Sequence, residues 1–148
     1  MKAKVIAVCI SEKKGTKKHP VPCVTLVEDH GILGDAHAGD KRAAFRHRQI
    51  SLLANESVDK MRALGAELYA GDFGENILTS GIDLVSIPVG TRLKVGEAEL
   101  EVTQIGKQCH NECEIKKQVG KCVMPTEGIF AKVIKGGDIH PNDDIIIL

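Results

Sequence analysis

Aromatic residues are scarce in this sequence of 148 residues, which contains one Tyr, three Phe and no Trp. The core must therefore be built mainly from aliphatic side chains. The scarcity also argues against a protein that binds single-stranded nucleic acid, because such proteins stack bases on aromatic rings.

An excess of charge of either sign is also missing. Lys and Arg together number 20, Asp and Glu together number 20, and the formal net charge is zero. Nucleic acids and anionic membrane surfaces both favour proteins with a net positive face. We therefore expect neither nucleic acid nor a membrane to be the main partner.

Long apolar runs are absent as well. No stretch approaches the roughly 20 apolar residues of a membrane-spanning helix. The apolar run within residues 1–9 is too short for a signal peptide, and charges follow it at residues 12–14. The five cysteines are an odd number without an export signal, so we expect reduced thiols and a cytoplasmic location.

Short apolar or alternating segments dominate what is present, and they predict β-strands. Most of them are bounded by glycine or proline turns. The predicted strands are residues 4–8, 21–27, 49–53, 92–95, 97–104, 128–135 and 145–148. The length fits one domain spanning residues 1–148, and we expect a mainly β fold that closes or half-closes as a barrel.

One helix of about three turns is predicted in the middle of the chain. Asn55 is a good N-cap residue, and Gly65 is a plausible stop. Between them, the apolar residues Val58, Met61 and Leu64 fall on one helical face. We therefore expect one or two short helices against the β structure.

A cluster of three cysteines follows the predicted strand 97–104 directly. Its members are Cys109, Cys113 and Cys122. Loops at strand ends commonly carry functional sites, and a neighbouring cation lowers the pKa of a thiol toward neutrality. Lys107, His110 and Lys121 are candidates for that cation, which makes Cys109 the candidate reactive thiol.

Two other interpretations of these thiols stay open. Cys113 and Cys122 could be small core residues, as free cysteines often are. The C-x3-C-x8-C spacing with His110 could also bind zinc, although no paired C-x2-C motif is present. Cys9 and Cys23 fall within predicted strands and are expected to be inert.

A second candidate constellation begins at residues 34–40. Asp35 and His37 could be metal ligands or a hydrogen-bonded pair. Cations downstream could bind an anion such as phosphate, for which the arginine fork is well suited. These cations are Arg42, Arg46, His47 and Arg48. The structural alternative, which spacing alone favours, is that Asp35 caps a turn and the arginines lie in a solvated loop.

A third constellation is the glycine loop 71–77. Its Asp72, Glu75 and Asn76 could hydrogen-bond the edge of a heterocycle, or they could brace the loop. The pattern alone favours a brace. Residues 17–19, Lys-Lys-His, are expected to be a solvated surface run.

Taken in order, these segments resemble the MOSC domain, the C-terminal module of molybdenum-cofactor sulfurase. The resemblance runs nearly end to end, and the order and spacing of the segments make it specific. The segments are residues 34–39, 48–53, 71–77, 89–97, 104–110 and 124–131. The signature cysteine of the family maps onto Cys109. Many members place proline before that cysteine, where this chain has Gln108.

The resemblance implies a β-barrel similar to the small barrel domain of pyruvate kinase. It also implies that Cys109 either carries sulfur as a persulfide or coordinates the molybdenum of the pterin cofactor. In sulfurases the module is fused to a pyridoxal-phosphate-dependent desulfurase, for which 148 residues leave no room. We therefore expect no pyridoxal phosphate site here, a separate cysteine desulfurase as donor, and a molybdoenzyme or cofactor-assembly protein as acceptor.

The leading functional hypothesis is a sulfur carrier, or sulfurtransferase, that accepts sulfur on Cys109 and delivers it to a molybdenum centre. Lys107 and His110 would stabilise the thiolate, and Cys113 or Cys122 would resolve the persulfide. The molybdenum cofactor would be bound by residues of the second and third constellations. These are His37, Asp35, Arg42, Arg46, Arg48, Asp72, Glu75 and Asn76.

Three alternatives remain. The protein could bind and deliver the cofactor without turnover, or it could be a molybdenum-dependent reductase with Cys109 as a metal ligand. A zinc-stabilised fold is the third, and it would unfold with chelator.

Overall fold

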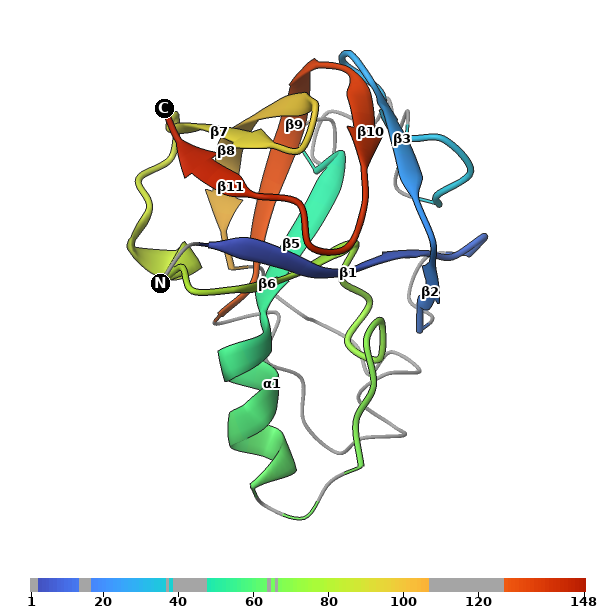
Figure 1. The fold of residues 1–148 in the computed structure, drawn as a ribbon, viewed down its shortest axis with the longest axis vertical. Helices are drawn as coiled ribbons and strands as arrows, with labels where there is room; N and C mark the ends of the chain where they lie inside the picture. The colour runs from blue at the N-terminus through green and yellow to red at the C-terminus, as the bar shows by residue number, and fades with distance from the viewer. Residues whose placement is uncertain are drawn as a thin grey trace.

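A curled eight-stranded sheet forms most of the computed structural model of this protein (Figure 1). The structure describes residues 3–13, 17–36, 38, 48–63, 65, 67–106 and 127–148. The order of strands in the sheet is β11-β7-β8-β9-β5-β6-β1-β2. Neighbouring strands are antiparallel except β5 and β6, which are parallel.

Most of these strands lie in segments that were predicted as strands from the sequence. The strands of the large sheet are β1 (Lys4–Ile10), β2 (His19–Val21), β5 (Ile50–Ala54), β6 (Ile77–Ser80), β7 (Arg92–Val95), β8 (Ala98–Ile105), β9 (Ile129–Lys135) and β11 (Ile145–Ile147). A second, three-stranded sheet has the order β10-β3-β4. Its strands are β10 (Gly137–Ile139), β3 (Val24–Val27) and β4 (Gly31–Ile32).

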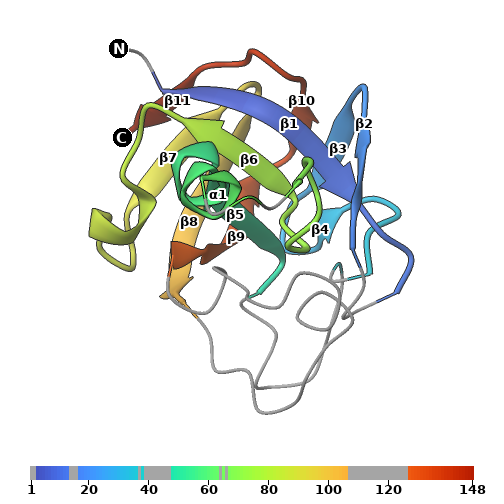
Figure 2. The ribbon, with the colours of Figure 1, turned by 90° about the horizontal axis from the view of Figure 1, so that it is seen from below.

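The large sheet curls until the start of β1 meets the chain that enters β11. The N–H of Ile145 donates to Ala3 O at 2.9 Å, and the N–H of Val5 donates to Asp143 O at 2.9 Å. On the same edge of β1, residues 8–10 pair with β2. Figure 2 shows β1 and β11 side by side, with both termini nearby. The mainly β fold class is confirmed, and the sheet is curled with only a short hydrogen-bonded link between β1 and the chain entering β11.

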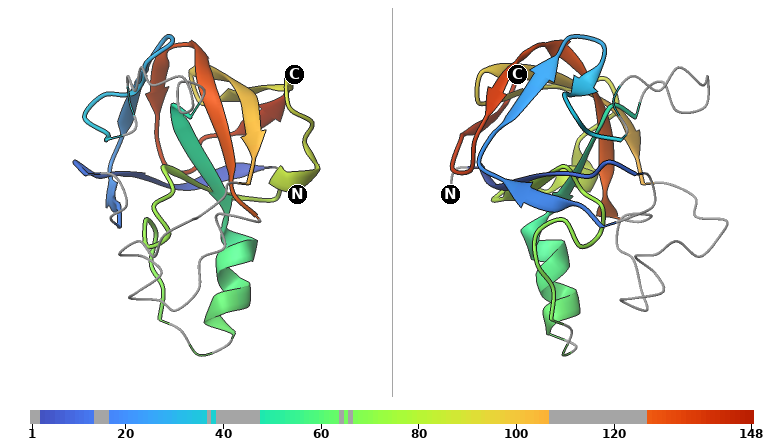
Figure 3. Two further views of the ribbon diagram at one scale, coloured as in Figure 1. Left: turned by 180° about the vertical axis from the view of Figure 1, so that it is seen from behind. Right: turned by 90° about the vertical axis from the view of Figure 1, so that its right-hand side faces the viewer.

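The small sheet lies against one flank of the large one (Figure 3). The N–H of Asp29 donates to Val133 O at 3.0 Å, which joins the β3–β4 turn to β9. Within the curl, the main core cluster consists only of valine, leucine, isoleucine and alanine, as the scarcity of aromatics predicts.

The helix α1 (Asn55–Arg62) follows β5 without a loop and extends below the sheet in Figure 1. Its N-cap residue is Ala54, so the prediction that Asn55 is the N-cap is wrong by one residue. Asn55 instead accepts a hydrogen bond from Arg62 Nη1 at 2.9 Å. Val58 and Met61 are buried as predicted.

A second hydrophobic cluster lies between α1 and the sheet. It contains two of the three phenylalanines, and its buried members are Leu53, Val58, Met61, Leu68, Phe73, Leu78 and Phe130. A short 3₁₀ helix, η1 (Leu84–Ser86), follows β6. In the part of the chain that the structure describes, no helix is long and apolar enough to cross a membrane.

The predicted strand 21–27 is wrong in one respect, because it is two strands in different sheets. β2 ends at Val21 and β3 begins at Val24, with Pro22 and Cys23 between them. Proline has no N–H to donate to a ladder, which favours a break at this position.

Candidate functional site

The residues predicted to form the site divide into two groups. Those outside the described residues are Lys107, Cys109, His110, Cys113, Cys122, His37, Arg42 and Arg46. Their roles, including Cys109 as a molybdenum ligand, stay predictions. The described members are Asp35, Arg48, Asp72, Glu75 and Asn76.

Residues 107–126, which contain the three clustered cysteines, connect β8 to β9. The two strands pair up to their ends, with Ile105 opposite Ile129. The N–H of Gly106 then donates to Gly128 O at 2.7 Å. The chain therefore leaves for Cys109 and returns from Cys122 at adjacent points on one end of the sheet.

Arg48 lies at this exit point. Its Nε donates to Gln104 Oε1 at 3.1 Å, and Gln104 Nε2 donates to Gly106 O at 2.7 Å. The guanidinium carbon lies 5.3 Å from the centroid of the Phe130 ring, within the range of a cation–π contact. Because a guanidinium stays charged at all physiological pH values, these contacts fix a permanent cation where the cysteine segment leaves the sheet.

Gln104 was not among the predicted site residues. The pairing of β8 with β9 shifts register between Val102 and Gln104, which indicates a β-bulge. Bulges commonly redirect a side chain beside a functional site. The sequence carries no local signal for this bulge, since residues 97–104 read as one regular strand.

Lys18 forms a buried ion pair with Asp35, so the expectation that residues 17–19 are all solvated is wrong at Lys18. Its Nζ lies 2.7 Å from Asp35 Oδ1 and donates to Ser11 Oγ at 3.1 Å. The N–H of Ser11 also donates to Asp35 Oδ1, at 3.1 Å. Burial lowers the pKa of Lys18, and the Asp35 carboxylate opposes that shift. The neighbouring Lys17 is partly exposed.

Glu75 is fully buried in the loop that joins α1 to β6. It accepts hydrogen bonds from the N–H of Gly71 at 2.8 Å and of Phe73 at 3.2 Å. Burial raises the pKa of Glu75 to about 7, and the backbone donors oppose the rise. Both carboxylate oxygens therefore bind the backbone of their own loop.

Asn76, also fully buried, joins three strands. Its Oδ1 accepts from the N–H of Ser51 at 3.0 Å, and its Nδ2 donates to Cys9 O at 3.1 Å. These are the contacts of a brace between β5, β6 and β1. For Glu75 and Asn76, hydrogen bonding to a heterocycle stays a prediction.

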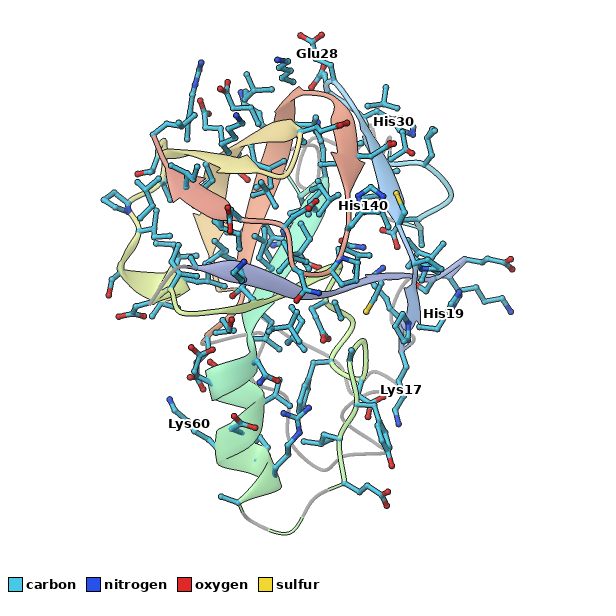
Figure 4. The ribbon with its side chains drawn as sticks, viewed as in Figure 1. Lys17, His19, Glu28, His30, Lys60 and His140 are labelled. Carbon is cyan, nitrogen blue, oxygen red and sulfur yellow. The ribbon has the colours of Figure 1, made fainter. Side chains whose placement is uncertain are left out.

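Asp72 lies at the rim of the loop that joins α1 to β6. Its Oδ2 accepts from the N–H of Tyr69 at 2.9 Å, and its Oδ1 is 4.0 Å from Lys17 Nζ. Figure 4 shows Lys17 on the opposite side of α1 from Lys60. Asp72 and Lys17 thus form a partly exposed, weakly paired edge next to the buried Lys18–Asp35 pair.

The described cysteines differ from one another in burial. Cys9 is fully buried in β1, and burial raises its pKa to about 12. Its thiol is therefore almost entirely protonated near neutral pH, as expected of an inert residue. Cys23 is partly buried and lies between β2 and β3 rather than within a strand. Among the described residues, no group of three His, Cys, Asp or Glu side chains gathers as a metal site.

A cavity of about 360 Å³ opens beside α1, lined by Ser57, Lys60, Asp83 and Glu127 among others. Glu127 Oε1 accepts from Ser57 Oγ at 2.9 Å and from Lys60 Nζ at 2.7 Å. Because Glu127 directly follows residues 107–126, these contacts tie the returning chain to α1.

Comparison with known proteins identifies a family. The protein-family model described as "MOSC domain" matches residues 33–146. A search of the curated proteins found no match.

Solved structures with the same fold include two bacterial proteins named YuaD and YiiM. YuaD from Bacillus subtilis is 22% identical with a TM-score of 0.79, and the match covers 98% of this chain and 94% of that one. YiiM from Geobacillus stearothermophilus is 19% identical with a TM-score of 0.70, covering 99% and 75%. YiiM from Escherichia coli is 19% identical with a TM-score of 0.69, covering 100% and 70%.

Proposed function

The chain belongs to the MOSC domain family, which is associated with the molybdenum cofactor, and we propose that it is a sulfur carrier with Cys109 as the accepting thiol. The observation that carries the proposal is the arrangement of Arg48, Gln104 and Gly106 at the end of β8. It holds a permanent cation where the chain leaves for Cys109, three residues beyond Gly106. Thiolates and persulfides are anions, and a fixed cation at the start of the segment that carries Cys109 is a group that favours both.

The step in which Cys109 accepts sulfur needs no external oxidant or reductant. The Cys109 thiolate attacks the terminal sulfur of a persulfide on a separate cysteine desulfurase. The sulfur–sulfur bond of the donor breaks, a new sulfur–sulfur bond forms on Cys109, and the donor cysteine leaves as a thiolate. Lys107 and His110 are the proposed partners that keep Cys109 ionised.

The delivering step uses two thiols of this chain. The thiolate of Cys113 or Cys122 attacks the inner sulfur of the Cys109 persulfide, and the terminal sulfur leaves as sulfide. The two cysteines become a disulfide, and the two electrons on the released sulfide come from them. An external thiol reductant then regenerates the carrier.

The acceptor in this proposal is the molybdenum cofactor of a molybdoenzyme or of a cofactor-assembly protein. The cofactor carries a phosphate, and a guanidinium suits phosphate through paired N–H donors. Arg48 has the chemistry to hold that phosphate, with Arg42, Arg46 and His37 as further candidates. The glycine loop consists of residues 71–76, because Ile77 begins β6. In this proposal Asp72, at the rim of the 71–76 loop, accepts hydrogen bonds from the pterin ring.

Sulfur loading tests the proposal. The reduced protein would be incubated with a cysteine desulfurase, pyridoxal phosphate and cysteine without oxygen, and peptide mass spectrometry would locate the added sulfur. We expect it on Cys109 in the wild type and in Cys23→Ala, a control that removes another thiol, and not in Cys109→Ala.

Loading on Cys23 instead, or no loading at all, would contradict the carrier proposal. Native mass spectrometry of the same sample would then show whether molybdopterin or zinc is bound. Bound molybdopterin would favour the delivery or reductase alternative, and bound zinc would favour the structural one.

A further inference from the structure

Lys18 connects two of the segments that were predicted to bind the cofactor. Its backbone N–H donates to Gly71 O at 2.8 Å, at the start of the 71–76 loop. Its side chain donates to Asp35 at 2.7 Å, in the turn that leads to His37. One residue thus contacts both segments, one through its backbone and the other through its side chain.

The end of β1 completes this junction. Ser11 accepts from Lys18 Nζ through its Oγ, and its N–H donates to Asp35 Oδ1. Its carbonyl accepts from the N–H of Ala36 at 2.8 Å. The turn at residues 35–36 is therefore fixed by hydrogen bonds to Ser11 as well as by the ion pair.

The backbone contact between Lys18 and the 71–76 loop is too close to accommodate a side chain at Gly71. A Cβ atom at Gly71 would lie 2.1 Å from Lys18 O, and Gly71 has a φ of +89°. Only glycine allows the two backbones to approach this closely. Glu75 then holds the rest of the loop through the N–H groups of Gly71 and Phe73.

We propose that Lys18 and Asp35 are positioning residues that set the turn before His37 against the 71–76 loop. Asp35 then acts through Lys18 and Ser11 rather than by contacting the ligand. Its side chain is completely buried, and its Oδ1 accepts from both of these residues. The inference rests on the proposed function in one respect, namely that these two segments bind the molybdenum cofactor.

The charged pair suits this role because it is directional. An ammonium held by a carboxylate and a hydroxyl has one favourable position, whereas an apolar contact tolerates small shifts. Replacing both members of a buried ion pair by apolar residues commonly preserves folding, but it removes that directionality. Stability and positioning can therefore be separated by mutation.

The test compares Lys18→Met/Asp35→Leu with Lys17→Met, a matched control that removes the adjacent, partly exposed lysine. Hydrogen exchange would be followed at the amides of Ala36 and Gly71, with the β8–β9 ladder as an internal reference. Affinity for isolated molybdenum cofactor would be measured on the same samples. Sulfur loading of Cys109 would be measured as well.

In the double variant we expect faster hydrogen exchange at Ala36 and Gly71, and unchanged hydrogen exchange in the β8–β9 ladder. We also expect about tenfold or greater loss of cofactor affinity, as when groups that orient a ligand's contacts are removed, while Cys109 still loads. If the double variant shows the same hydrogen exchange at Ala36 and Gly71 as the wild type, and the same affinity for the cofactor, the inference is overturned. If the wild type itself binds no cofactor, the cofactor part of the proposed function fails, and exchange alone decides whether the pair positions the two segments.

Discussion

Lys18 Nζ and Asp35 Oδ1 lie 2.7 Å apart, with side chains that are 1% and 0% exposed. Removing one member of such a pair leaves an uncompensated buried charge, which typically costs about 3–5 kcal/mol. We expect Lys18→Met to lose stability in this range in urea unfolding. The Lys17→Met control should change the free energy of unfolding by no more than about 0.5 kcal/mol.

The double variant Lys18→Met/Asp35→Leu should recover most of that loss, because neither charge then remains buried. If Lys18→Met unfolds at the same urea concentration as Lys17→Met, the ion pair does not contribute to stability as described.

Gly71→Ala should lower the free energy of unfolding much more than Gly90→Ala. Both glycines have a positive φ, +89° and +95°, but a Cβ at Gly71 meets Lys18 O at 2.1 Å, whereas Gly90 has nothing within 4 Å. We expect Gly90→Ala to cost about 1–2 kcal/mol from its backbone conformation. Gly71→Ala adds a backbone clash and should cost about 2–5 kcal/mol or prevent folding. Equal thermal unfolding temperatures for the two variants would show that the close approach is not there.

Glu75 should make the protein less stable as pH rises through the weakly acidic range. Its pKa is raised from 4.5 to about 7 in the folded state, so the folded protein binds a proton that the unfolded chain has lost. The stability linked to this proton is fully present below pH 4.5 and is lost as pH rises to about 7. The full effect is on the order of 3 kcal/mol.

Glu75→Gln cannot ionise and should flatten that pH dependence in urea unfolding measured between pH 4.5 and 8. Glu12→Gln, at an exposed carboxylate, controls for the loss of one charge. A Glu75→Gln variant with the same pH slope as Glu12→Gln would contradict the assignment.

Cys9 should be the least reactive thiol. With a pKa of about 12, its thiolate fraction near pH 8 is on the order of 10⁻⁴, and its side chain is fully buried. Iodoacetamide at pH 8 should therefore alkylate Cys109 well before Cys9, as followed by peptide mass spectrometry over time. Alkylation of Cys9 at the rate of Cys109 in the folded protein would be inconsistent with the burial seen in β1.

Much of the fold could be predicted from the sequence, because strand periodicity and glycine turns are local signals. The hairpin of β7 and β8 and the strand β9 lie where alternation placed them. The strand β6 was missed because its four residues, Ile-Leu-Thr-Ser, do not alternate clearly. Its position is set by parallel pairing with β5, a contact between segments distant in the chain.

The candidate site was less predictable, because its contacts also join segments that are distant in the chain. Lys18 belongs to a charged run, and only its partner 17 residues away makes its burial favourable. Gln104 faces Arg48 from 56 residues away, beyond a bulge without a local signature. In contrast, Glu75 and Asn76 sit in a glycine loop whose pattern does favour the bracing contacts that the structure describes.

Sulfur transfer by Cys109 can be followed directly with ³⁵S-cysteine. The desulfurase would load the carrier with labelled sulfur, the loaded carrier would be isolated, and molybdenum cofactor lacking the sulfur ligand would then be added with a thiol reductant. We expect the label to leave Cys109 and to appear in the cofactor, and we expect Cys109→Ala to transfer none. Label that stays on Cys109, or that reaches the cofactor equally with Cys109→Ala, would contradict the carrier function.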